Sequence, residues 1–383
     1  KIGGFFMSTI TKGIKRIPFP LILLLFGLLF FLPFLGTFEL TAITEGEYSG
    51  VAREMVNRSE FISPYFNNTF WADKPPIHLW LLVFFGKLGG WSEFSLRLPG
   101  VLMSILTGLL IYHIGQKYYS KKTGFSAALI FFTTIEMIIA GQIIFVDMTL
   151  TFFIVLALYF FLRFFTDGRR RSSICCFFLA CAGAVLTKGL IGLLIPGGGA
   201  LVYLFWNKEW DVFKQHAKDL LIGFFLFLLV SVPWFVVETF RHGDAFINRF
   251  FIYFNIERFT KGVDNVNPWY YYLVIVPLTF FPWSAFPRTI ASSFKLGENK
   301  KLNRVILSLS LFTILFFSIS KTKLHTYLLP LYPFWSLMTA VGWERIWAKK
   351  ERSLWSLFAG TLILFPLTMI ALFILSSNTS GNN

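Results

Sequence analysis

The sequence predicts an all-α polytopic membrane protein, and three observations lead to this fold class. First, 55% of the 383 residues are hydrophobic, only 14% are charged and the mean hydropathy is +0.65, whereas a soluble domain carries charge all round its surface. Second, apolar runs of about 17 to 25 residues, the length that crosses a bilayer as a helix, recur along the chain. Third, basic residues concentrate in alternate connections between these runs.

The apolar runs give about eleven transmembrane helices, of which two, at 174–187 and 305–319, are short. A further run at 77–88 is too short to cross and is expected to lie at the membrane interface. The predicted spans are 18–37, 98–115, 124–141, 148–165, 174–187, 190–206, 220–237, 269–287, 305–319, 324–342 and 354–376.

The net charge of +15 would suggest nucleic acid as the partner of a soluble protein, but here its distribution has a topological explanation. If segment 1–17 is cytoplasmic, it and the alternate connections hold 22 of the 35 Lys and Arg residues, against 12 in the opposite connections. The positive-inside rule is then satisfied. Acidic residues show the reverse bias, 13 against 7, although they influence topology little. We therefore expect membrane lipids rather than nucleic acid as the surroundings, and chemistry at the outer face.

The chain is expected to form one unit. A cytoplasmic N-terminus at 1–17 precedes a transmembrane domain at 18–376 and a polar tail at 377–383. Two outer loops, 38–97 and 238–268, are long, whereas short connections are the rule between packed helices. Long loops on one face predict a functional site there.

The first outer loop begins with Glu45 and Glu47 in the stretch TEGEYSGVAREM, whose apolar spacing predicts a short helix on the membrane surface. Glu45 comes just before this helix, so its carboxylate can satisfy free N–H groups and the helix dipole. The functional alternative is a general base or a group that orients an acceptor, which requires a partner site nearby.

The same loop contains WADKPPIHLW, in which the prolines predict a helix that begins near Pro75. Lys74 then lies beside a helix N-terminus, which is unfavourable for an ammonium group unless an anion such as a phosphate joins them. The alternative is a solvated ion pair between Asp73 and Lys74.

Two further acidic residues lie at or near the outer face. Asp147, in GQIIFVDMTLTFF, occupies the outer start of a span, where it can cap the helix or serve as a site carboxylate. Glu136 falls inside the preceding span and needs a partner or an aqueous cavity.

More cations gather at the outer face. Lys188 lies in AVLTKGLIG, Lys321 and Lys323 lie with Tyr327 in SISKTKLHTYLLPLYP, and Arg258 lies in the second outer loop. Basic residues on this side oppose the topological bias, and attraction for an anion at the membrane surface explains them. Snorkelling of each lysine to lipid headgroups is the alternative.

One scheme uses these groups together. Outer cations bind the phosphate of a lipid-linked sugar donor, while outer carboxylates deprotonate or orient an acceptor hydroxyl. A sugar joined to polyprenyl phosphate already has a leaving group once its charge is neutralised, so no nucleotide is needed. The absence of P-loop and dinucleotide signatures agrees with this scheme.

The sequence resembles the GT-C class of integral-membrane glycosyltransferases, specifically the bacterial branch related to protein O-mannosyltransferases and to the lipid A aminoarabinose transferase. The resemblance runs from about residue 38 to 340. It is carried, in family order, by EGEYSGVAREM, DKPP, LRLPG, VDMTLT, LTKG, VPW, NIERFT, WYYYLVIVPLTFFPW and SKTKLHTYLLPLYP. It implies the GT-C fold, a polyprenyl-phosphate sugar donor and a site on the periplasmic side of a bacterial inner membrane.

The resemblance also implies roles for individual residues. Lys74, Lys188, Arg258 and Tyr327 would contact the donor phosphate, and Asp147 would be an acidic residue of the catalytic site. Supporting roles are expected for Asp73, Asn255, Lys321 and Lys323.

Two positions depart from the family. The first-loop catalytic carboxylate usually opens a D-E-x-x-Y pattern, where this chain has Thr44, so Glu45 becomes the candidate base. Aminoarabinose transferases also carry Glu-Lys-Pro in the first loop and a Glu-His pair before the x-x-R-F stretch, groups that suit a divalent ion. This chain has Asp73 at the first place and Phe254 with Asn255 at the second, so neither a metal nor another cofactor is predicted.

The sequence therefore predicts a glycosyltransferase that moves a hexosyl or pentosyl group from polyprenyl phosphate to lipid A or lipopolysaccharide, another glycan or a protein. Single displacement with inversion is the expected course. The alternatives are a transporter or flippase of lipid-linked sugars and a non-catalytic relative, the latter because of Thr44. Transporters place charges near the membrane midplane, whereas these charges gather at one outer face.

Overall fold

The structure is a computed structural model that describes residues 18–40, 44–293 and 299–348. Ten of the eleven predicted spans fall in these ranges, and each of the ten contains helix. The eleventh, 354–376, lies outside the described residues, as do the predicted N-terminal segment and polar tail. The all-α polytopic fold class is confirmed.

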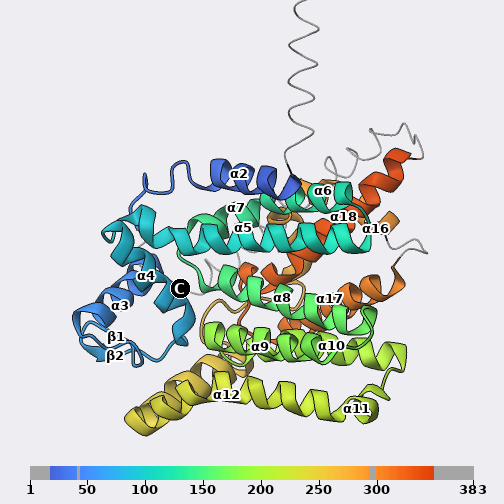
Figure 1. Cartoon of the computed structure of the whole chain (residues 1–383). Helices are drawn as coiled ribbons and strands as arrows, with labels where there is room; N and C mark the ends of the chain where they lie inside the picture. The colour runs from blue at the N-terminus through green and yellow to red at the C-terminus, as the bar shows by residue number, and fades with distance from the viewer. Residues whose placement is uncertain (1–17, 41–43, 294–298, 349–383) are drawn as a thin grey trace, which may run out of the picture.

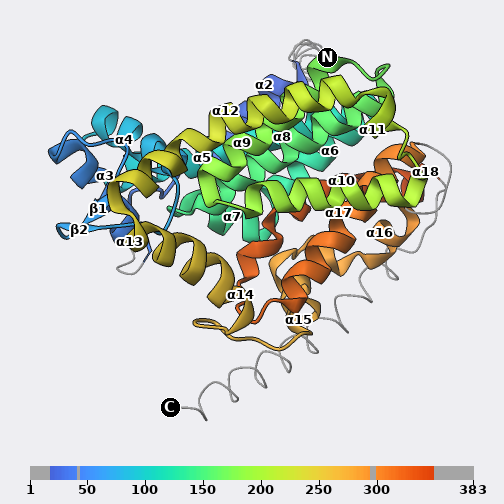
Figure 2. The ribbon, with the colours of Figure 1, turned by 90° about the horizontal axis from the view of Figure 1, so that it is seen from below.

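Long helices lie side by side and form the body of the molecule (Figures 1 and 2). Within the described ranges, five of them are long and apolar enough to cross a membrane, namely α5 (Glu93–Tyr118), α8 (Val146–Thr166), α9 (Arg171–Lys188), α12 (Ala217–His242) and α17 (Lys300–Ile319). A sixth candidate span consists of α6 (Lys121–Phe132) and α7 (Ile135–Gln142), which meet at an angle of 66°. The shorter apolar helices are α2 (Phe19–Phe31), α4 (Pro76–Gly89) and α10 (Ile191–Asn207).

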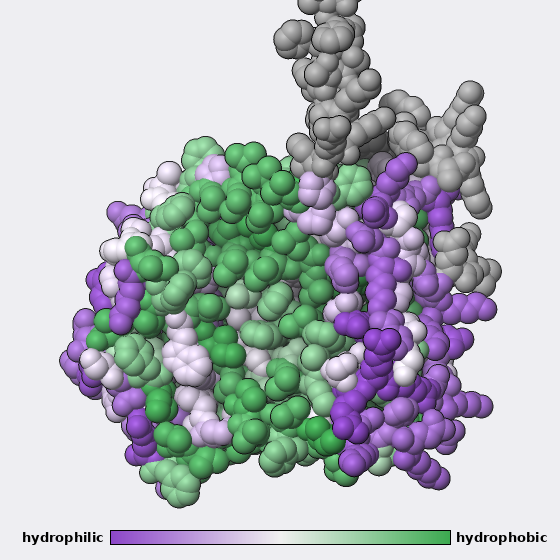
Figure 3. All heavy atoms as spheres, viewed as in Figure 1, coloured by the Kyte–Doolittle hydropathy of each residue, from purple (hydrophilic) through white to green (hydrophobic). Residues whose placement is uncertain are grey.

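The surface agrees with insertion in a bilayer. Figure 3 shows hydrophobic residues over the middle of one face and hydrophilic residues toward both ends of the helices. On α12 large apolar side chains point outward, among them Phe225, Leu229 and Phe240. Because helices satisfy their own backbone hydrogen bonds, such a belt can face hydrocarbon without cost.

Besides 124–141, which is divided between α6 and α7, two predicted spans are not continuous helices, which corrects the sequence prediction. The run 269–287 contains α15 (Tyr271–Thr279) and the 3-10 turn η2 (Trp283–Ala285), and α16 (Pro287–Ser293) follows. The run 324–342 starts with the 3-10 turn η3 (His325–Leu331) and continues as α18 (Tyr332–Ala348). Prolines explain the interruptions in these two runs, because each removes a backbone donor and fixes φ.

The first outer loop is folded against one end of the bundle (Figure 1). The predicted surface helix is present as α3 (Glu45–Asn57), and its Val51, Ala52 and Met55 are buried. A small antiparallel hairpin, β1 (Tyr65–Phe66) and β2 (Thr69–Phe70), is the departure from the purely helical prediction. The predicted helix after Pro75 begins at Pro76 as α4.

The second outer loop is largely helical. After α12 come α13 (Asp244–Phe246), the π-helix η1 (Ile247–Glu257) and α14 (Arg258–Thr260). A π-helix is rare and often marks a functional site, because its wider turn changes which side chains face a neighbour. The short α11 (Val212–Gln215) connects α10 to α12.

Candidate functional site

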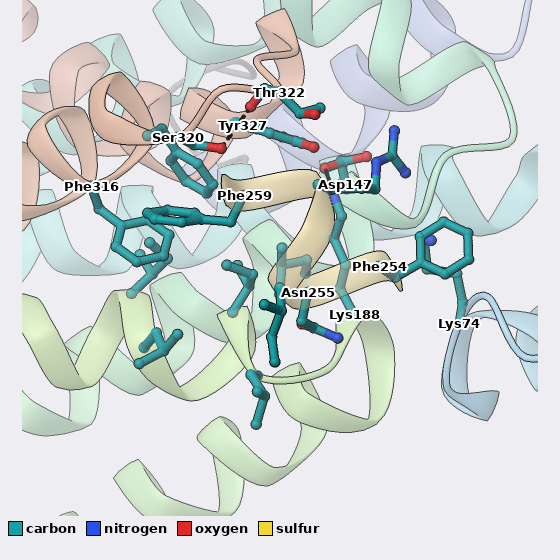
Figure 4. Close-up of a pocket in the computed structure, with 18 of the residues that line it drawn as sticks. Lys74, Asp147, Lys188, Phe254, Asn255, Phe259, Phe316, Ser320, Thr322 and Tyr327 are labelled. Atoms are coloured by element: carbon teal, nitrogen blue, oxygen red, sulfur yellow. Dashed lines mark hydrogen bonds and ion pairs between the residues drawn. The ribbon is translucent and has the colours of Figure 1, made fainter. Parts of the chain in front are cut away.

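A cavity of ≈ 330 Å³ lies where the two outer loops meet the bundle. Its polar lining includes seven residues that the sequence predicted, Asp73, Lys74, Asp147, Lys188, Asn255, Arg258 and Tyr327. The rest of the lining is largely apolar and comes from α10, α14, α17 and η1. In Figure 4, Lys74, Asp147 and Lys188 lie toward one side of the cavity, and Phe259 and Phe316 lie toward the other.

The centre of the polar side is an ion pair between two helix ends. Asp147 is in the first turn of α8 and Lys188 is the last residue of α9, and Nζ of Lys188 lies 2.5 Å from Oδ1 of Asp147. Both side chains are largely buried, with exposed fractions of 15% for Lys188 and 7% for Asp147. The ammonium also lies 5.0 Å from the ring centre of Tyr327, a cation–π contact. Asp147 does not cap α8, so pairing rather than capping explains it.

Lys74 is held beside the N-terminus of α4, as its position before two prolines predicts. Its Nζ donates to the backbone oxygen of Asp73 at 2.9 Å and lies 4.4 Å from the ring centre of Phe254. Burial above all, together with the nearby cations Lys188 and Arg258, lowers the pKa of Lys74 to about 8. An anion in the cavity would restore the charged form of this ammonium.

The predicted alternative of an ion pair between the side chains of Asp73 and Lys74 is wrong. The carboxylate of Asp73 accepts from Nε and Nη2 of Arg249, at 2.9 and 3.3 Å. The guanidinium also packs on the rings of Tyr253 and Phe254, 4.8 and 4.9 Å from their centres. Arg249 thus joins the segment that carries Lys74 to η1.

Arg258 begins α14 and brings a third cation to the cavity. One nitrogen, Nη2, lies 3.5 Å from a carboxylate oxygen of Asp264. Its Nε is buried and has no hydrogen-bond partner among the described residues. Since buried donors are rarely left unpaired, this N–H is available to a ligand.

Asn255 and Tyr327 complete the predicted lining. The amide of Asn255 donates to the backbone oxygen of Phe250, at 2.6 Å, so part of its hydrogen-bonding capacity is used inside η1. The ring of Tyr327 packs on Phe317, with ring centres 4.7 Å apart, between the polar and the apolar lining.

Glu45, the candidate base, does not line the cavity. It is 1% exposed, and its two oxygens accept from Nε and Nη2 of Arg97 at 2.8 and 2.9 Å. One of them also accepts from the backbone N–H of Ile144, at 3.1 Å. The carboxylate therefore links α3 to α5 and to the connection before α8, so the contacts of Glu45 indicate a structural role.

The two predicted supporting lysines also lie outside the cavity lining. Lys323 is buried and donates to the backbone oxygens of Asn267 and Ser320. Lys321 is exposed, and its backbone N–H donates to Phe259. Both belong to the segment that pairs with the end of the second outer loop.

The residues at the positions where relatives carry metal ligands do not fit a metal ion. Asp73 is occupied by Arg249, Phe254 offers no donor atom, and Asn255 already donates to a carbonyl. Among the described residues, no cluster of three or more His, Cys, Asp or Glu side chains is placed to hold a metal. The expectation that the protein uses no metal remains a prediction.

Sequence patterns did not reveal the apolar half of the lining. One apolar run, which by its sequence indicates only a membrane span, contains Leu190, Ile191 and Leu194. Phe316 lies near the end of another such run. Their common face becomes visible only when α10 and α17 pack together. Arg97, the partner of Glu45, was visible only as part of the motif LRLPG.

Several known proteins are similar to this chain in sequence. The family model described as dolichyl-phosphate-mannose-protein mannosyltransferase matches residues 73–236. A Pseudomonas fluorescens protein named undecaprenyl phosphate-alpha-4-amino-4-deoxy-L-arabinose arabinosyl transferase 2 is 28% identical over 374 residues, covering 95% of this chain and 63% of the relative. An uncharacterized protein of Aquifex aeolicus is 30% identical over 300 residues, covering 77% of this chain and 66% of its own length.

A solved structure is similar as well. The crystal structure of ArnT from Cupriavidus metallidurans bound to undecaprenyl phosphate matches with a TM-score of 0.79 at 25% identity, covering 90% of this chain and 63% of that chain. The chain thus spans 63 to 66% of the length of these proteins.

The fold, the site and these similarities point to one class of protein: the chain is similar in sequence and structure to integral-membrane glycosyltransferases of the GT-C class. Within that class the chain is similar to the aminoarabinose transferases in both sequence and structure. The family resemblance of the sequence is confirmed.

Proposed function

We propose that the protein transfers a hexosyl or pentosyl group from a polyprenyl phosphate carrier to an acceptor at the outer face of a bacterial inner membrane. One observation carries this proposal: a single cavity joins three cations to an apolar groove. A ligand that satisfies both parts has an anionic head and a hydrocarbon tail. The names of the relatives, which print undecaprenyl phosphate and a sugar, support the same donor class.

The polar side of the cavity suits a phosphodiester that becomes a leaving group. Lys188, Arg258 and Lys74 bind the phosphate oxygens, and Tyr327 contacts them from η3. When the bond between the anomeric carbon and the phosphate oxygen breaks, the phosphate gains a negative charge. Cations that are already fixed in place stabilise this charge more than that of the intact donor, which accelerates the transfer.

Asp147 has two roles in this scheme. In the empty site it neutralises Lys188, and both charges would be costly to bury alone. When the donor phosphate engages Lys188, the carboxylate of Asp147 becomes free to orient a hydroxyl of the sugar or the acceptor. No cofactor is needed, because the carrier phosphate itself is the leaving group.

The apolar side suits the first isoprene units of the carrier. The groove is lined by Leu194 and Ile195 of α10 and by Phe316 and Phe317 of α17. The rest of the tail would continue into the lipid beside these helices. With the N-terminus cytoplasmic, the cavity lies on the periplasmic side, where the acceptor would be lipid A or lipopolysaccharide, another glycan or a protein.

The test is release of free undecaprenyl phosphate from a panel of undecaprenyl phosphate sugars by the purified protein in lipid nanodiscs. We expect release from one donor, and we expect Asp147→Asn and Lys188→Met to reduce it. Lys321→Met is the matched control, since this exposed lysine lies outside the cavity lining. Tight binding of the donors without release from any of them would favour a transporter or a non-catalytic relative.

A further inference from the structure

We propose that His325 and Glu136 form an imidazole–carboxylate pair that accepts the proton of the acceptor, and that the acceptor atom is therefore a hydroxyl oxygen. This inference rests on the proposed transfer of a sugar from polyprenyl phosphate. It assigns the general base, a role that the ion-paired carboxylates of the site leave open.

The two side chains are joined by a short hydrogen bond. Nδ1 of His325 lies 2.6 Å from Oε1 of Glu136, and Glu136 is 2% exposed whereas the His325 side chain is 39% exposed. A carboxylate at Nδ1 fixes the tautomer, so Nδ1 carries the hydrogen and Nε2 is the free base. Nε2 has no hydrogen-bond partner within the described part of the chain. A buried carboxylate behind a partly exposed imidazole is the arrangement by which acids orient a general base.

The pair lies beside the cavity. His325 is two residues before Tyr327 in η3, and successive residues of a 3-10 helix point about 120° apart, so the two side chains leave the turn in different directions. Tyr327 lines the cavity, and His325 faces α7, where Glu136 lies. Asp147 of α8 is near enough to act electrostatically on the imidazole. His325 thus flanks the site on the side of α7.

The charged and titratable surroundings of the imidazole can be named from the elements that pack on η3. They are Glu136 of α7 and Asp147 of α8, and Glu136 has Tyr271 of α15 and Tyr332 of α18 as further neighbours. Asp147 is in turn paired with Lys188, whose ammonium lies 5.0 Å from the ring centre of Tyr327 in the same turn. The two carboxylates stabilise the imidazolium that forms when Nε2 takes a proton.

The other carboxylates are weaker candidates for the base. Glu45 lies outside the cavity lining and accepts three hydrogen bonds from Arg97 and Ile144. Asp147 is paired with Lys188 in the free protein and, once the donor phosphate engages Lys188, serves to orient a hydroxyl beside that ammonium. An imidazole ordinarily titrates nearer to neutral pH than a carboxylate does, and the hydrogen bond with Glu136 raises the pKa of His325, which strengthens Nε2 as a base.

The step balances without another reactant. Nε2 of His325 takes the proton of the acceptor hydroxyl, and the oxygen forms a bond to the anomeric carbon of the donor sugar. The bond from that carbon to the phosphate oxygen breaks, and its electron pair leaves with the polyprenyl phosphate. The imidazolium then releases the proton to water from its exposed side. A phosphate acceptor is already ionised and needs no base, so the pair predicts a hydroxyl acceptor.

The experiment uses the protein in nanodiscs with whichever undecaprenyl phosphate sugar of the panel it cleaves, with lipid A added. The rate of release of undecaprenyl phosphate measures the sum of two reactions, transfer of the sugar to lipid A and transfer of the sugar to water. Dissociation constants for the same donor are measured in parallel. The variants are His325→Gln, His325→Asn and Glu136→Gln. His113→Gln is the matched control, because His113 also bonds a side chain, Tyr159, which lies twelve residues along α8 from Asp147 and therefore away from the cavity.

We expect the His325 variants to lose about 10²–10⁴-fold in the rate of release, with donor affinity unchanged. We expect the rate of the wild type to decline at acidic pH, as Nε2 becomes protonated, and we expect this decline to vanish in the His325 variants. Glu136→Gln should lose less and keep a shifted pH profile. Where lipid A is modified, mass spectrometry should find the sugar on a hydroxyl.

Three outcomes would overturn the assignment: an unchanged rate, a loss of donor binding together with the rate in both His325 variants, or sugar attached to a lipid A phosphate. Failure of the wild type to bind or cleave any donor would instead overturn the proposed transferase function.

Discussion

Nζ of Lys188 lies 2.5 Å from a carboxylate oxygen of Asp147, although the two residues are 41 positions apart and occupy opposite ends of their helices in sequence. The antiparallel packing of α8 and α9 brings the N-terminus of one to the C-terminus of the other. Negative charge is favoured at the first site and positive charge at the second, so both helix dipoles support the pair. The pair holds a cation in a largely buried place until an anionic ligand competes for it.

Because the donor phosphate and Asp147 compete for Lys188, substitutions of Lys188 and of Asp147 should have opposite effects on donor binding. Lys188→Met should weaken binding of undecaprenyl phosphate about 10- to 100-fold, since hydrogen bonds to charged groups contribute about 1.5–3 kcal/mol. Asp147→Asn should tighten binding, because it removes an anion that competes with the phosphate, while the rate of sugar transfer falls. Titration of both variants in nanodiscs tests this. Weaker binding by Asp147→Asn would show that the carboxylate does not compete.

The pKa of Lys74, lowered to about 8 by burial, predicts a pH dependence of donor binding. A polyprenyl phosphate sugar is a phosphodiester and keeps one negative charge over this range. Below pH 8 the ammonium is already protonated in the free protein and attracts the donor. Above pH 8 binding must also take up a proton, so log Kd should rise by up to one unit per pH unit. Lys74→Arg, which stays charged, should abolish the effect; a wild-type Kd that is constant from pH 7 to 10 would contradict it.

Arg249 should act as a positioning residue for Lys74. Arg249→Met removes the two hydrogen bonds to Asp73 and the stacking on η1. Because the guanidinium is half exposed, we expect only a modest effect, a several-fold rise in the KM for donor with little change in kcat. Arg249→Lys should recover part of the loss, since it keeps the charge without the bidentate geometry.

The pairing of Asp73 with Arg249 also leads to a prediction about metals. Because the carboxylate of Asp73 is already hydrogen-bonded to Arg249, incubation with a chelator should leave the rate of transfer unchanged. Loss of activity that zinc restores would contradict this account of the first outer loop.

The buried pair of Glu45 and Arg97 should matter for stability rather than for chemistry. Arg97→Met leaves the Glu45 carboxylate buried without its counter-charge and should lower the free energy of unfolding by about 3–5 kcal/mol. The double variant Glu45→Leu with Arg97→Met should recover much of this loss. Thermal unfolding in detergent measures both. If Glu45→Gln reduced the rate per folded molecule by about 10²-fold, Glu45 would be a base after all.

Seven of the residues predicted from the sequence line one cavity, whereas three others, Glu45, Lys321 and Lys323, lie outside its lining. Lys74 could be placed because two prolines define the helix start beside it, and Asp147 because it opens a span. Glu45 looked equivalent, since nothing local shows that Arg97, 52 residues later, would cover it. Pairing between distant segments decides which carboxylate faces a cavity, and periodicity carries no such information.

The helical fold class and the order of the apolar runs were predicted, and the errors concern the places where a helix breaks. Two breaks lie at prolines, and a third, between α6 and α7, lies at Thr133 and Thr134. A hydropathy run shows how much apolar chain is present but not whether one helix continues through it. The interruption before α18 is important for function, because it places His325 and Tyr327 on a 3-10 turn. The apolar groove could not be predicted either, since it requires α10 and α17 to pack together.

The groove itself can be tested by filling it. Leu194 lines the cavity and is 42% exposed, so Leu194→Trp should be tolerated by the fold. We expect it to weaken binding of undecaprenyl phosphate, whose tail must share this space, and to spare a short-chain analogue such as isopentenyl phosphate. Equal loss for both ligands would mean that the groove does not hold the tail.

The central claim is that this cavity binds the phosphate of a polyprenyl carrier. Native mass spectrometry of the protein titrated with undecaprenyl phosphate tests it most directly, with Lys188→Met compared against Lys321→Met. The account predicts a saturable single site that is lost or weakened at least tenfold in Lys188→Met and unchanged in Lys321→Met. Equal affinity of all three proteins would place the carrier elsewhere and contradict the assignment of the site.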